Sequence, residues 1–423
     1  MKHFWKCLLL ALMFLPEVVD AQNIYARKGF LDLRQWDFEQ SHIPLNGEWE
    51  FYMSELIAPN DFSNKVKFPQ DYIDFPATWN ELSRGRRPGD GYATYHLKVL
   101  IKAPASLALE LPHFYSNYNL WINAELIAAN GQVGTTEKTS KPQWRPQTVS
   151  FNATSDTLDI VIQASNFHHA KGGVRELLLL GDARKLEFKK KVASISNLTE
   201  FGGLAVTTLF FVFLFLFSRP ERSLLYFAGL CLTWAIRSMF SNRYVAISFF
   251  PDFPWEICVK IEYITLYLMM IMAILFIARL FKNEVNSASK YLFCLFNSIF
   301  ILLTLFFTAS LYTQFLPVYL SFAAVLLVYV VYILIRALVY EREGVWFMIS
   351  CMFLGVIMFS YDIVSYQGFA TFNPVILSVG YFIMYMLMGV GLLFQLGYLK
   401  RPTGHVSVLT YEDLYGDGKK EKR

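Results

Sequence analysis

Seven apolar segments fill residues 199–399 of this 423-residue chain. A helix of about 20 apolar residues spans the ~30 Å hydrocarbon core of a bilayer, where every backbone N–H and C=O must be satisfied internally. Each segment is long enough for one crossing, so this half is predicted to form an all-α seven-helix transmembrane bundle. The expected spans lie near residues 199–217, 224–248, 257–280, 291–311, 316–338, 345–366 and 374–398.

The overall composition agrees with a membrane protein. Hydrophobic residues make up 55% of the chain, so membrane lipid is one of its partners. The formal net charge is only +4 and is not gathered into a patch that would bind phosphates. No nucleic-acid partner is therefore expected.

The N-terminal segment is typical of a secretory signal peptide. Lys2 and Lys6 precede the apolar stretch Leu8–Leu15, which is too short to span a bilayer, and the small residues Val19 and Ala21 suit a cleavage site after position 21. The chain is therefore divided into a signal peptide (1–21), an exported domain (22–195), a seven-transmembrane domain (196–399) and a short tail (400–423).

The exported domain is predicted to be all-β. Short alternating runs are separated by Pro, Gly, Asn and Asp, and no amphipathic helix longer than about three turns is indicated between residues 42 and 182. Many short strands without intervening helices indicate a sandwich or jelly roll. The expected strands are Gly47–Tyr52, Thr94–Ile101, Leu107–Leu111, Tyr118–Ile122, Leu158–Gln163 and Glu176–Leu180.

No metal or other cofactor is expected. Apart from Cys7 in the signal segment, every cysteine falls within or at the edge of the apolar half, so residues 22–198 fold without disulfides or a cysteine-based zinc site. His168 and His169 are adjacent, and adjacent side chains of a strand point apart and rarely bind one metal ion.

The basic residues of the loops between spans predict the orientation. One set of loops contains only Arg243, whereas the alternate set is rich in Lys and Arg. By the positive-inside rule the basic set is cytoplasmic, which places the N-terminal domain in the periplasm of a bacterial inner membrane and the tail in the cytoplasm. The basic set contains Arg219, Arg222, Arg279, Lys282, Lys290, Arg336, Arg342, Lys400 and Arg401.

Several motifs of the exported half resemble the jelly-roll sugar-binding domain of β-galactosidases and β-glucuronidases. They are Leu45-Asn-Gly-Glu-Trp-Glu-Phe51, Pro76-Ala-Thr-Trp79, Gly91-Tyr-Ala-Thr-Tyr-His-Leu97 and Tyr118-Asn-Leu-Trp-Ile-Asn123. The last is similar to a Trp-Val-Asn-Gly hairpin of those domains, although Ala124 replaces the glycine. The sugar-binding domain is the non-catalytic part of those enzymes, so the resemblance implies no enzymatic activity for this chain.

The domain order extends the resemblance over residues 40–399. Ala129-Asn-Gly-Gln-Val-Gly134, Ser165-Asn-Phe167 and Gly172-Gly173, followed by seven spans, resemble the bacterial seven-transmembrane receptors with diverse intracellular signalling modules. The resemblance implies an outer domain that senses carbohydrate-like or other small ligands and a cytoplasmic cyclase, kinase or phosphatase module. This sequence departs from that pattern, because only a short tail with no catalytic motif follows the last span.

Ligand recognition is sought first among tryptophans, because sugar C–H groups stack on aromatic faces. Trp49 and Trp121 occupy alternating strand patterns and are expected to be core residues. Trp144 lies between Pro142 and Pro146 in a loop and is either an exposed stacking platform or a packing residue.

Two polar loops provide further candidate ligand-binding residues. Arginine clusters grip carboxylates bidentately, so the loop around residues 83–90 suggests an anionic ligand, although a solvated loop has the same composition. The second loop covers residues 164–176. The candidates of the two loops are Arg84, Arg86, Arg87, Asn166, His168 and Arg175.

Two charged residues lie within the predicted spans. Ionisable groups in a membrane are costly and normally pair or line a cavity. Arg237 falls near the middle of the second span and Asp362 in the sixth, and a contact between them requires neighbouring helices. They form either a structural clamp or part of a switching network.

These observations favour a signal receptor that binds a carbohydrate-like or anionic small ligand and acts through a separate cytoplasmic protein, such as a cyclase or kinase. Lys282–Lys290 and Val406–Tyr415 are the candidate docking segments. A homodimer is compatible with this reading. The alternative is a membrane-anchored binding or transport accessory, or a scaffold protein, although the sparse polar lining of the spans argues against a solute pathway.

Overall fold

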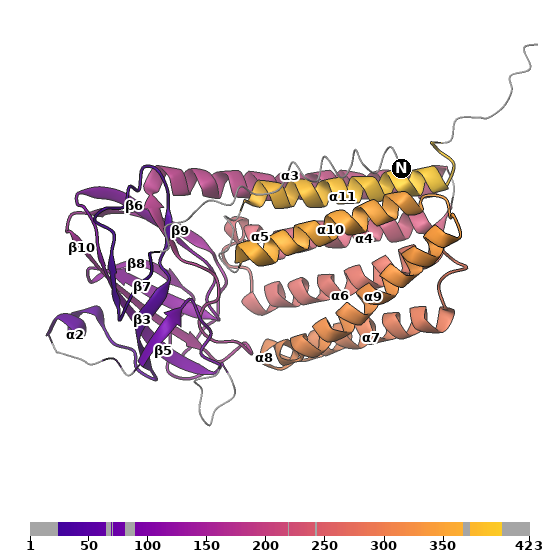
Figure 1. The fold of residues 1–423 in the computed structure, drawn as a ribbon. Coiled ribbons are helices and arrows are strands. Elements are labelled where there is room, and N and C mark those ends of the chain that lie inside the picture. The colour runs from indigo at the N-terminus through magenta and orange to yellow at the C-terminus, as the bar shows by residue number, and fades with distance from the viewer. Residues whose placement is uncertain are drawn as a thin grey trace, which may run out of the picture.

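The computed structural model describes residues 24–64, 69, 71–80, 89–218, 220–241, 243–366 and 373–399. A β-domain lies at one end of the molecule, and long helices extend away from it (Figure 1). The expected signal peptide, the tail and Arg84, Arg86 and Arg87 lie outside the described residues, as does the side chain of Asp362.

The β-domain consists of two sheets. In the described residues the larger sheet has the order β4-β3-β5-β10-β7-β8, its neighbours are antiparallel, and β1 pairs in parallel with β5. Its strands are β1 (Phe30–Asp32), β3 (Gly47–Met53), β4 (Asp71–Phe75), β5 (Gly91–Leu100), β7 (Asn117–Ile122), β8 (Glu125–Asn130) and β10 (Thr157–Asn166). The smaller sheet has the order β2-β11-β6-β9, formed by β2 (Ile43–Pro44), β6 (Ala105–Leu111), β9 (Gln147–Ala153) and β11 (Leu179–Asp182).

One apolar core lies between the two sheets. Tyr95 and Leu97 of β5 are fully buried in it together with Leu107 and Leu109 of β6. Trp49 stacks on Phe75 with 4.2 Å between ring centroids. Alternation along each strand therefore directs one set of side chains inward, as the period of two requires. The predicted all-β domain with packed sheets, ahead of an all-α domain, is confirmed.

The strands that the sequence did not predict are mainly edge strands. β4, β8 and β9 lie at the ends of their sheets. An edge strand has one neighbour and exposes more of its side chains, so its apolar alternation is weak. The expected strand Glu176–Leu180 also differs, because pairing begins only at Leu179.

Helix α3 (Ala183–Phe217) joins the two domains without a linker. It begins directly after β11, and the Asp182 carboxylate caps it by accepting the backbone N–H of Lys185 at 3.0 Å. Its 35 residues correspond to ~52 Å, well beyond a ~30 Å hydrocarbon core. The helix starts before the span expected at 199–217 because its first turns pack Leu186 against Ala108 of β6.

The remaining helices form the bundle in Figure 1. In the described residues six helical segments are long and apolar enough to span a membrane, and α10 contributes the shorter apolar stretch Val345–Tyr361. The expected second span, 224–248, is wrong at its end, because α4 stops at Phe240 and α5 is separate. The helices are α4 (Arg222–Phe240), α5 (Val245–Phe249), α6 (Trp255–Leu280), α7 (Ser287–Phe306), α8 (Ala309–Tyr312), α9 (Leu316–Val339), α10 (Val345–Tyr366) and α11 (Pro374–Gln395).

The outer face of the larger sheet carries a buried histidine between two carboxylates. His96 on β5 is 3% exposed. Its Nδ1 lies 2.6 Å from Glu50 on β3, and its Nε2 lies 2.6 Å from Asp159 on β10. Phe62 of α2 (Pro59–Asn64) stacks on the imidazole at 4.2 Å. Burial opposes protonation of the ring, but the hydrogen bonds to Asp159 and Glu50 outweigh it and raise the pKa of His96.

This histidine predicts a distinctive dependence of stability on pH. Because the pKa of His96 is raised above 6.5 in the folded chain, its stabilisation is complete below pH 6.5 and is lost as pH rises through the folded value. We expect His96→Gln to lower the free energy of unfolding of the β-domain by about 2 kcal/mol at pH 6 and by less at pH 9. Denaturant unfolding of the detergent-solubilised chain at both pH values measures this difference. A loss that stays the same at both pH values would contradict a charged His96.

Candidate functional site

The most distinctive site lies where the β-domain meets the helices, and Trp144 is at its centre. Of the two readings left open for Trp144, the packing residue is correct and the exposed platform is wrong, because its side chain is only 4% exposed. Its ring lies 5.0 Å from His113 and 5.5 Å from His169 of the β-domain, measured between ring centroids. It also lies 5.3 Å from Tyr244 and 5.5 Å from Trp255 of the helical domain. The residues that cover Trp144 come from distant parts of the sequence.

We name this cluster the aromatic joint. It consists of His113, Tyr115, Trp144, His169, Tyr244 and Trp255. Trp144 also belongs to an apolar cluster of the bundle that reaches Tyr263, Tyr267 and Tyr319. The joint therefore continues the core of the membrane domain into the β-domain.

Both histidines of the joint are uncharged at neutral pH. Burial lowers the pKa of His113 to about 4, and the Lys171 ammonium acts in the same direction. Burial also lowers the pKa of His169 to about 3. The backbone N–H of Lys171 donates to Nδ1 of His169 at 3.0 Å, which requires an unprotonated nitrogen there. The two histidines thus pack in the joint as uncharged rings. Charged groups lie beside them, with Lys171 Nζ 6.0 Å from the Tyr115 ring centroid and Glu176 Oε1 3.5 Å from His113 Nδ1.

The loop of residues 167–172 forms a second contact between the domains. Its Ala170 backbone N–H donates to Thr313 Oγ1 at the bundle end, at 3.0 Å. On its other side the amide of Asn80 donates to Ala170 O at 2.7 Å and accepts the Gly172 N–H at 3.0 Å. The loop therefore connects the bundle to residues beside the arginine segment.

The sequence-predicted ligand residues have different environments. Asn166 is fully buried, and its Nδ2 donates to Gly89 O at 2.9 Å and to His169 O at 2.7 Å, so it fixes the loop. His168 is half-buried, with Nε2 3.1 Å from Ser140 O and its ring 6.3 Å from that of Trp255. Arg175 is exposed on the following segment. The structure thus brings Trp144 and His168 together at the joint and leaves Arg175 outside it.

Charged groups add a third contact. Glu110 on β6 lies 3.0 Å from Lys189 Nζ of α3 and 3.6 Å from Arg243 Nη2 in the segment after α4. Burial opposes ionisation of this carboxyl, but Lys189 and Arg243 outweigh it and lower the pKa of Glu110. The carboxylate therefore joins the β-domain, α3 and the end of α4.

Below the joint, Arg237 is held by α6. Its Nη1 donates to the backbone carbonyl of Glu262 at 2.5 Å, and the guanidinium also acts electrostatically on the Glu262 carboxylate. The Tyr244 hydroxyl donates to Glu262 Oε2 at 3.1 Å, which connects this pair to the aromatic joint. In the described residues Arg237 thus neighbours Glu262, whereas the sequence suggested Asp362, whose side chain is not among them.

The sequence reasoning missed a second buried acidic residue. Glu200 of α3 is 7% exposed and accepts the indole N–H of Trp234 on α4 at 2.7 Å. Ser378 of α11 is also hydrogen-bonded to it. The sequence does contain a signal for this residue, which is a single carboxyl at the start of an apolar span. Such groups occur in membrane helices mainly where a partner residue binds them. Glu200 therefore ties α3, α4 and α11 together.

The polar groups of this region join separate elements of the chain. Among the residues that the structure describes, no group of three or more His, Cys, Asp or Glu side chains has a geometry that would hold a metal ion. The conspicuous polar groups instead connect one element to another: loop to helix at Thr313, strand to helix at Glu110, and helix to helix at Glu200 and Glu262. The first two of these contacts link the β-domain to the helices.

We predict that Trp144 keeps the two domains docked. In a chain whose native cysteines are replaced, Ala170→Cys and Thr313→Cys should form a disulfide rapidly. Trp144→Ala removes a buried ring at the joint and should slow this reaction by about tenfold or more, whereas Trp144→Phe should slow it less. Timed oxidation followed by gel analysis measures the rate. Tyr72→Ala, which truncates an exposed ring on β4, is the control, and an equal rate in both alanine variants would contradict the prediction.

We also predict that Arg237 stabilises the membrane domain. Arg237→Met leaves the half-buried Glu262 without its cation and should cost roughly 2 kcal/mol. Arg279→Met is the matched control, because the Arg279–Glu221 pair, 2.8 Å apart, is 43% and 40% exposed, and such pairs contribute about 0–1 kcal/mol. Melting temperatures in detergent compare the two variants. Similar shifts would indicate that Arg237 has no special structural role.

Comparison with known proteins covers both halves of the chain. Residues 197–399 match the family described as 7TM diverse intracellular signalling. No curated protein matches the chain.

Solved structures similar to this chain are glycosidases. A GH2 β-galacturonidase from Eisenbergiella tayi bound to galacturonate is 12% identical, with 34% of this chain and 24% of that chain covered and a TM-score of 0.25. A Faecalibacterium prausnitzii β-glucuronidase is 15% identical, with 33% and 31% covered and a TM-score of 0.25. A β-D-mannosidase from Dictyoglomus thermophilum is 11% identical, with 34% and 22% covered and a TM-score of 0.23. This chain thus spans a third or less of those proteins, and the likeness concerns the fold alone.

The family match lies within the helical half of the chain. It covers α4 to α11 and most of α3, which are the elements that receive the β-domain at the joint. The helical half is thus similar to the 7TM diverse intracellular signalling family, and the protein is a multi-pass membrane protein with a two-sheet β-domain ahead of its helices.

Proposed function

We propose that this chain is a receptor that lies in a bacterial inner membrane with its β-domain in the periplasm. The described loops at the β-domain end of the bundle carry one basic residue, Arg243, whereas those at the opposite end carry Lys282 and Arg342. Arg222 and Arg279 lie in the first turn of α4 and the last turn of α6 at that opposite end. The positive-inside rule assigns the basic end to the cytoplasm. The signal peptide expected at residues 1–21 agrees with export of the β-domain.

The proposed ligand is a carbohydrate-like or other small molecule with an anionic group. Its contacts are assigned to Arg84, Arg86 and Arg87, since arginines bind carboxylates bidentately, and to the exposed Arg175. Asn80 and Gly89 flank the arginine segment, and both hydrogen-bond to the 166–172 region. A ligand held by these arginines would therefore pull on the loop that touches Thr313.

The observation that carries the proposal is the unbroken attachment of the β-domain to the bundle. Helix α3 continues from β11 without a linker, and the aromatic joint holds the other side of the domain. Two attachment points on different helices convert a tilt of the domain into relative motion of those helices. A ligand that binds one tilt better shifts the population of bundle arrangements by its differential affinity.

Output is assigned to a separate cytoplasmic protein such as a cyclase or kinase. The proposed docking surface comprises Lys282–Lys290 between α6 and α7, and the tail segment Val406–Tyr415. In the first of these, Arg342 Nε donates to Glu284 Oε1 at 2.7 Å, so the loop is tied to the segment between α9 and α10. A change in helix packing would thus alter two cytoplasmic segments together.

The full chain in lipid nanodiscs tests the proposal. On an array of neutral and uronic-acid glycans, the wild-type chain should bind acidic glycans, and the triple variant Arg84→Ala, Arg86→Ala, Arg87→Ala should lose at least about tenfold in affinity. The exposed Arg27→Ala is the matched control.

The bound glycan should also change the rate at which cysteines at 170 and 313 form a disulfide. Absence of binding to any glycan would overturn the ligand assignment. Binding without a change in that rate would overturn transmission through the joint.

A further inference from the structure

Helix α3 carries a line of exposed apolar side chains. At its β-domain end Phe188 and Ile195 are 68% and 63% exposed. Further along, Val206, Leu209 and Phe213 are 68%, 58% and 57% exposed. At about 100° per residue these five side chains lie within about 60° of one another around the helix axis. Figure 1 shows α3 along the outer edge of the molecule, where such a line is free to contact a partner.

These side chains belong to a seven-residue repeat, which we name the α3 seam. Every seventh residue of Phe188–Leu216 lies on the line, as does every seventh residue of Val192–Phe213, and none of these positions is buried. The residues that α3 does bury, such as Leu204, lie on the opposite side of the helix. A repeat of this kind, sustained over four heptads, is the pattern of a two-stranded coiled coil.

Membrane lipid covers only part of the seam. A ~30 Å hydrocarbon core takes up about 20 residues of α3, which are those from 198 to 217. Asn197 lies at this boundary, because its side chain donates to Ser238 O, close to the end of α4, at 3.4 Å. Phe188 precedes Asn197 by ~13 Å along the helix, whereas the headgroup layer is only about 6 Å thick. The exposed ring of Phe188 therefore lies in water.

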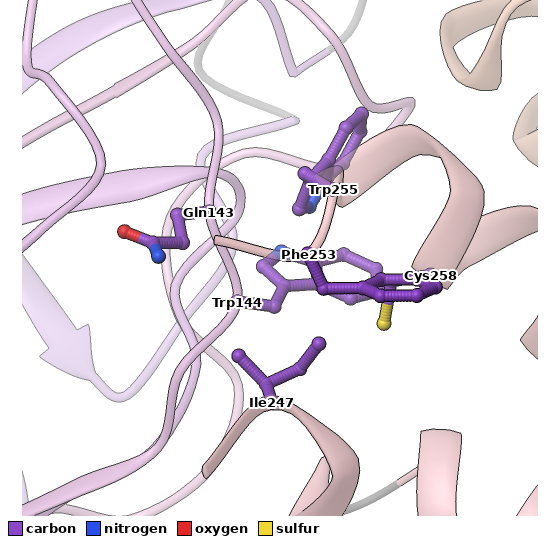
Figure 2. A pocket seen from close by; sticks show the side chains of 6 residues that line it. All are labelled: Gln143, Trp144, Ile247, Phe253, Trp255 and Cys258. Atoms are coloured by element: carbon purple, nitrogen blue, oxygen red, sulfur yellow. The ribbon is translucent and has the colours of Figure 1, made fainter. Parts of the chain in front are cut away.

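The exposure of Phe188 contrasts with the enclosure of the rings at the aromatic joint. There Trp144 and Trp255 are only 4% and 9% exposed (Figure 2). Around Phe188 the helix surface is charged, with the exposed Lys185 on one side of the seam and the exposed Lys191 on the other. A narrow apolar line between charged borders is typical of a helix that packs against one partner helix.

Gly202 is a second feature of the seam that a single chain does not explain. Glycine is unfavourable within a helix, and a Cβ at position 202 would meet no atom of the described residues within 4 Å. The neighbouring Gly203 is different, because a Cβ there would lie 2.6 Å from the Phe382 ring of α11. Small residues of membrane helices allow two backbones to approach closely. Gly202 and Thr199, one turn earlier on the seam, fit such an approach.

We propose that two copies of this chain associate through their α3 seams. The occupant of the seam has to present an apolar line that continues without a break from the membrane to ~13 Å beyond its core, and a second α3 has that shape. Copies inserted in the same direction pair in parallel, so a two-fold axis places Phe188 beside its counterpart. The exposed apolar side chains of α3 leave on the order of 100 Å² each uncovered, together roughly 800 Å² per copy, which is the size of a standard interface.

Cross-linking between copies tests the seam. In the full chain with its native cysteines replaced, Ile195→Cys is introduced, and the membranes are oxidised and analysed on gels. Lys190→Cys is the matched control, since position 190 is also exposed but lies about 160° away from Phe188 around the helix. Ile195→Cys should form a covalent dimer at least about tenfold faster, because paired seam positions come within disulfide reach. Equal rates would overturn the proposal, as would a cross-linked product whose mass is not twice that of the chain.

The variant Gly202→Leu separates association from folding. Because position 202 has free space within its own chain, this variant should keep the helix content measured by circular dichroism. In the dimer the added side chain holds the two backbones apart, so energy transfer between labelled copies in liposomes should show association weakened at least about tenfold. Ala324→Leu, which enlarges an exposed residue of α9, is the control and should associate as the wild type does. Unchanged association of Gly202→Leu would overturn the seam as the interface. Neither result bears on glycan binding, which the arginine variants test separately.

Discussion

The architecture depends on the insertion of one β-domain side chain, Trp144, into the aromatic end of the helical bundle. Its ring contacts Tyr244 and Trp255 on one side and His113 and His169 on the other. Burying an aromatic ring of this size stabilises a contact by roughly 1.5–3 kcal/mol, and neutral histidines allow the packing without desolvating a charge. Without this contact the domain would be held by α3, by the Ala170–Thr313 hydrogen bond and by the Glu110–Arg243 pair.

The buried polar groups give the joint a route into the bundle. Tyr244 contacts Trp144 with its ring and Glu262 with its hydroxyl, and the Glu262 carbonyl accepts Arg237. One turn earlier on α4, Trp234 donates to Glu200 of α3. Charged groups at this depth are costly when they lose their hydrogen-bond partners, so a shift of α4 would replace one set of partners by another and not merely lengthen the hydrogen bonds. A helix that exchanges partners in this way has two discrete arrangements. Contact alone does not establish coupling, so a variant in the joint has to be tested for its effect on the packing of the helices.

The sequence predicted the two domains and most central strands, because apolar spans and inward alternation are local patterns. It missed β4, β8 and β9, whose edge positions weaken that alternation. The start of α3 was also missed, since its first turns cover a sheet and are polar on the other side. For Trp144 the local pattern, a proline-flanked loop, left exposure and packing open. Part of its burial comes from Tyr244 and Trp255, about a hundred residues away, and no pattern within the loop contains that information.

If a soluble ligand at the β-domain favours one position of loop 167–172, it acts on the hydrogen bond between the Ala170 N–H and Thr313 Oγ1. The ligand and the arrangement of the bundle then each change the other's equilibrium by the same factor, because coupling free energies are reciprocal. The size of that coupling would depend on how firmly the aromatic joint holds the domain against the helices.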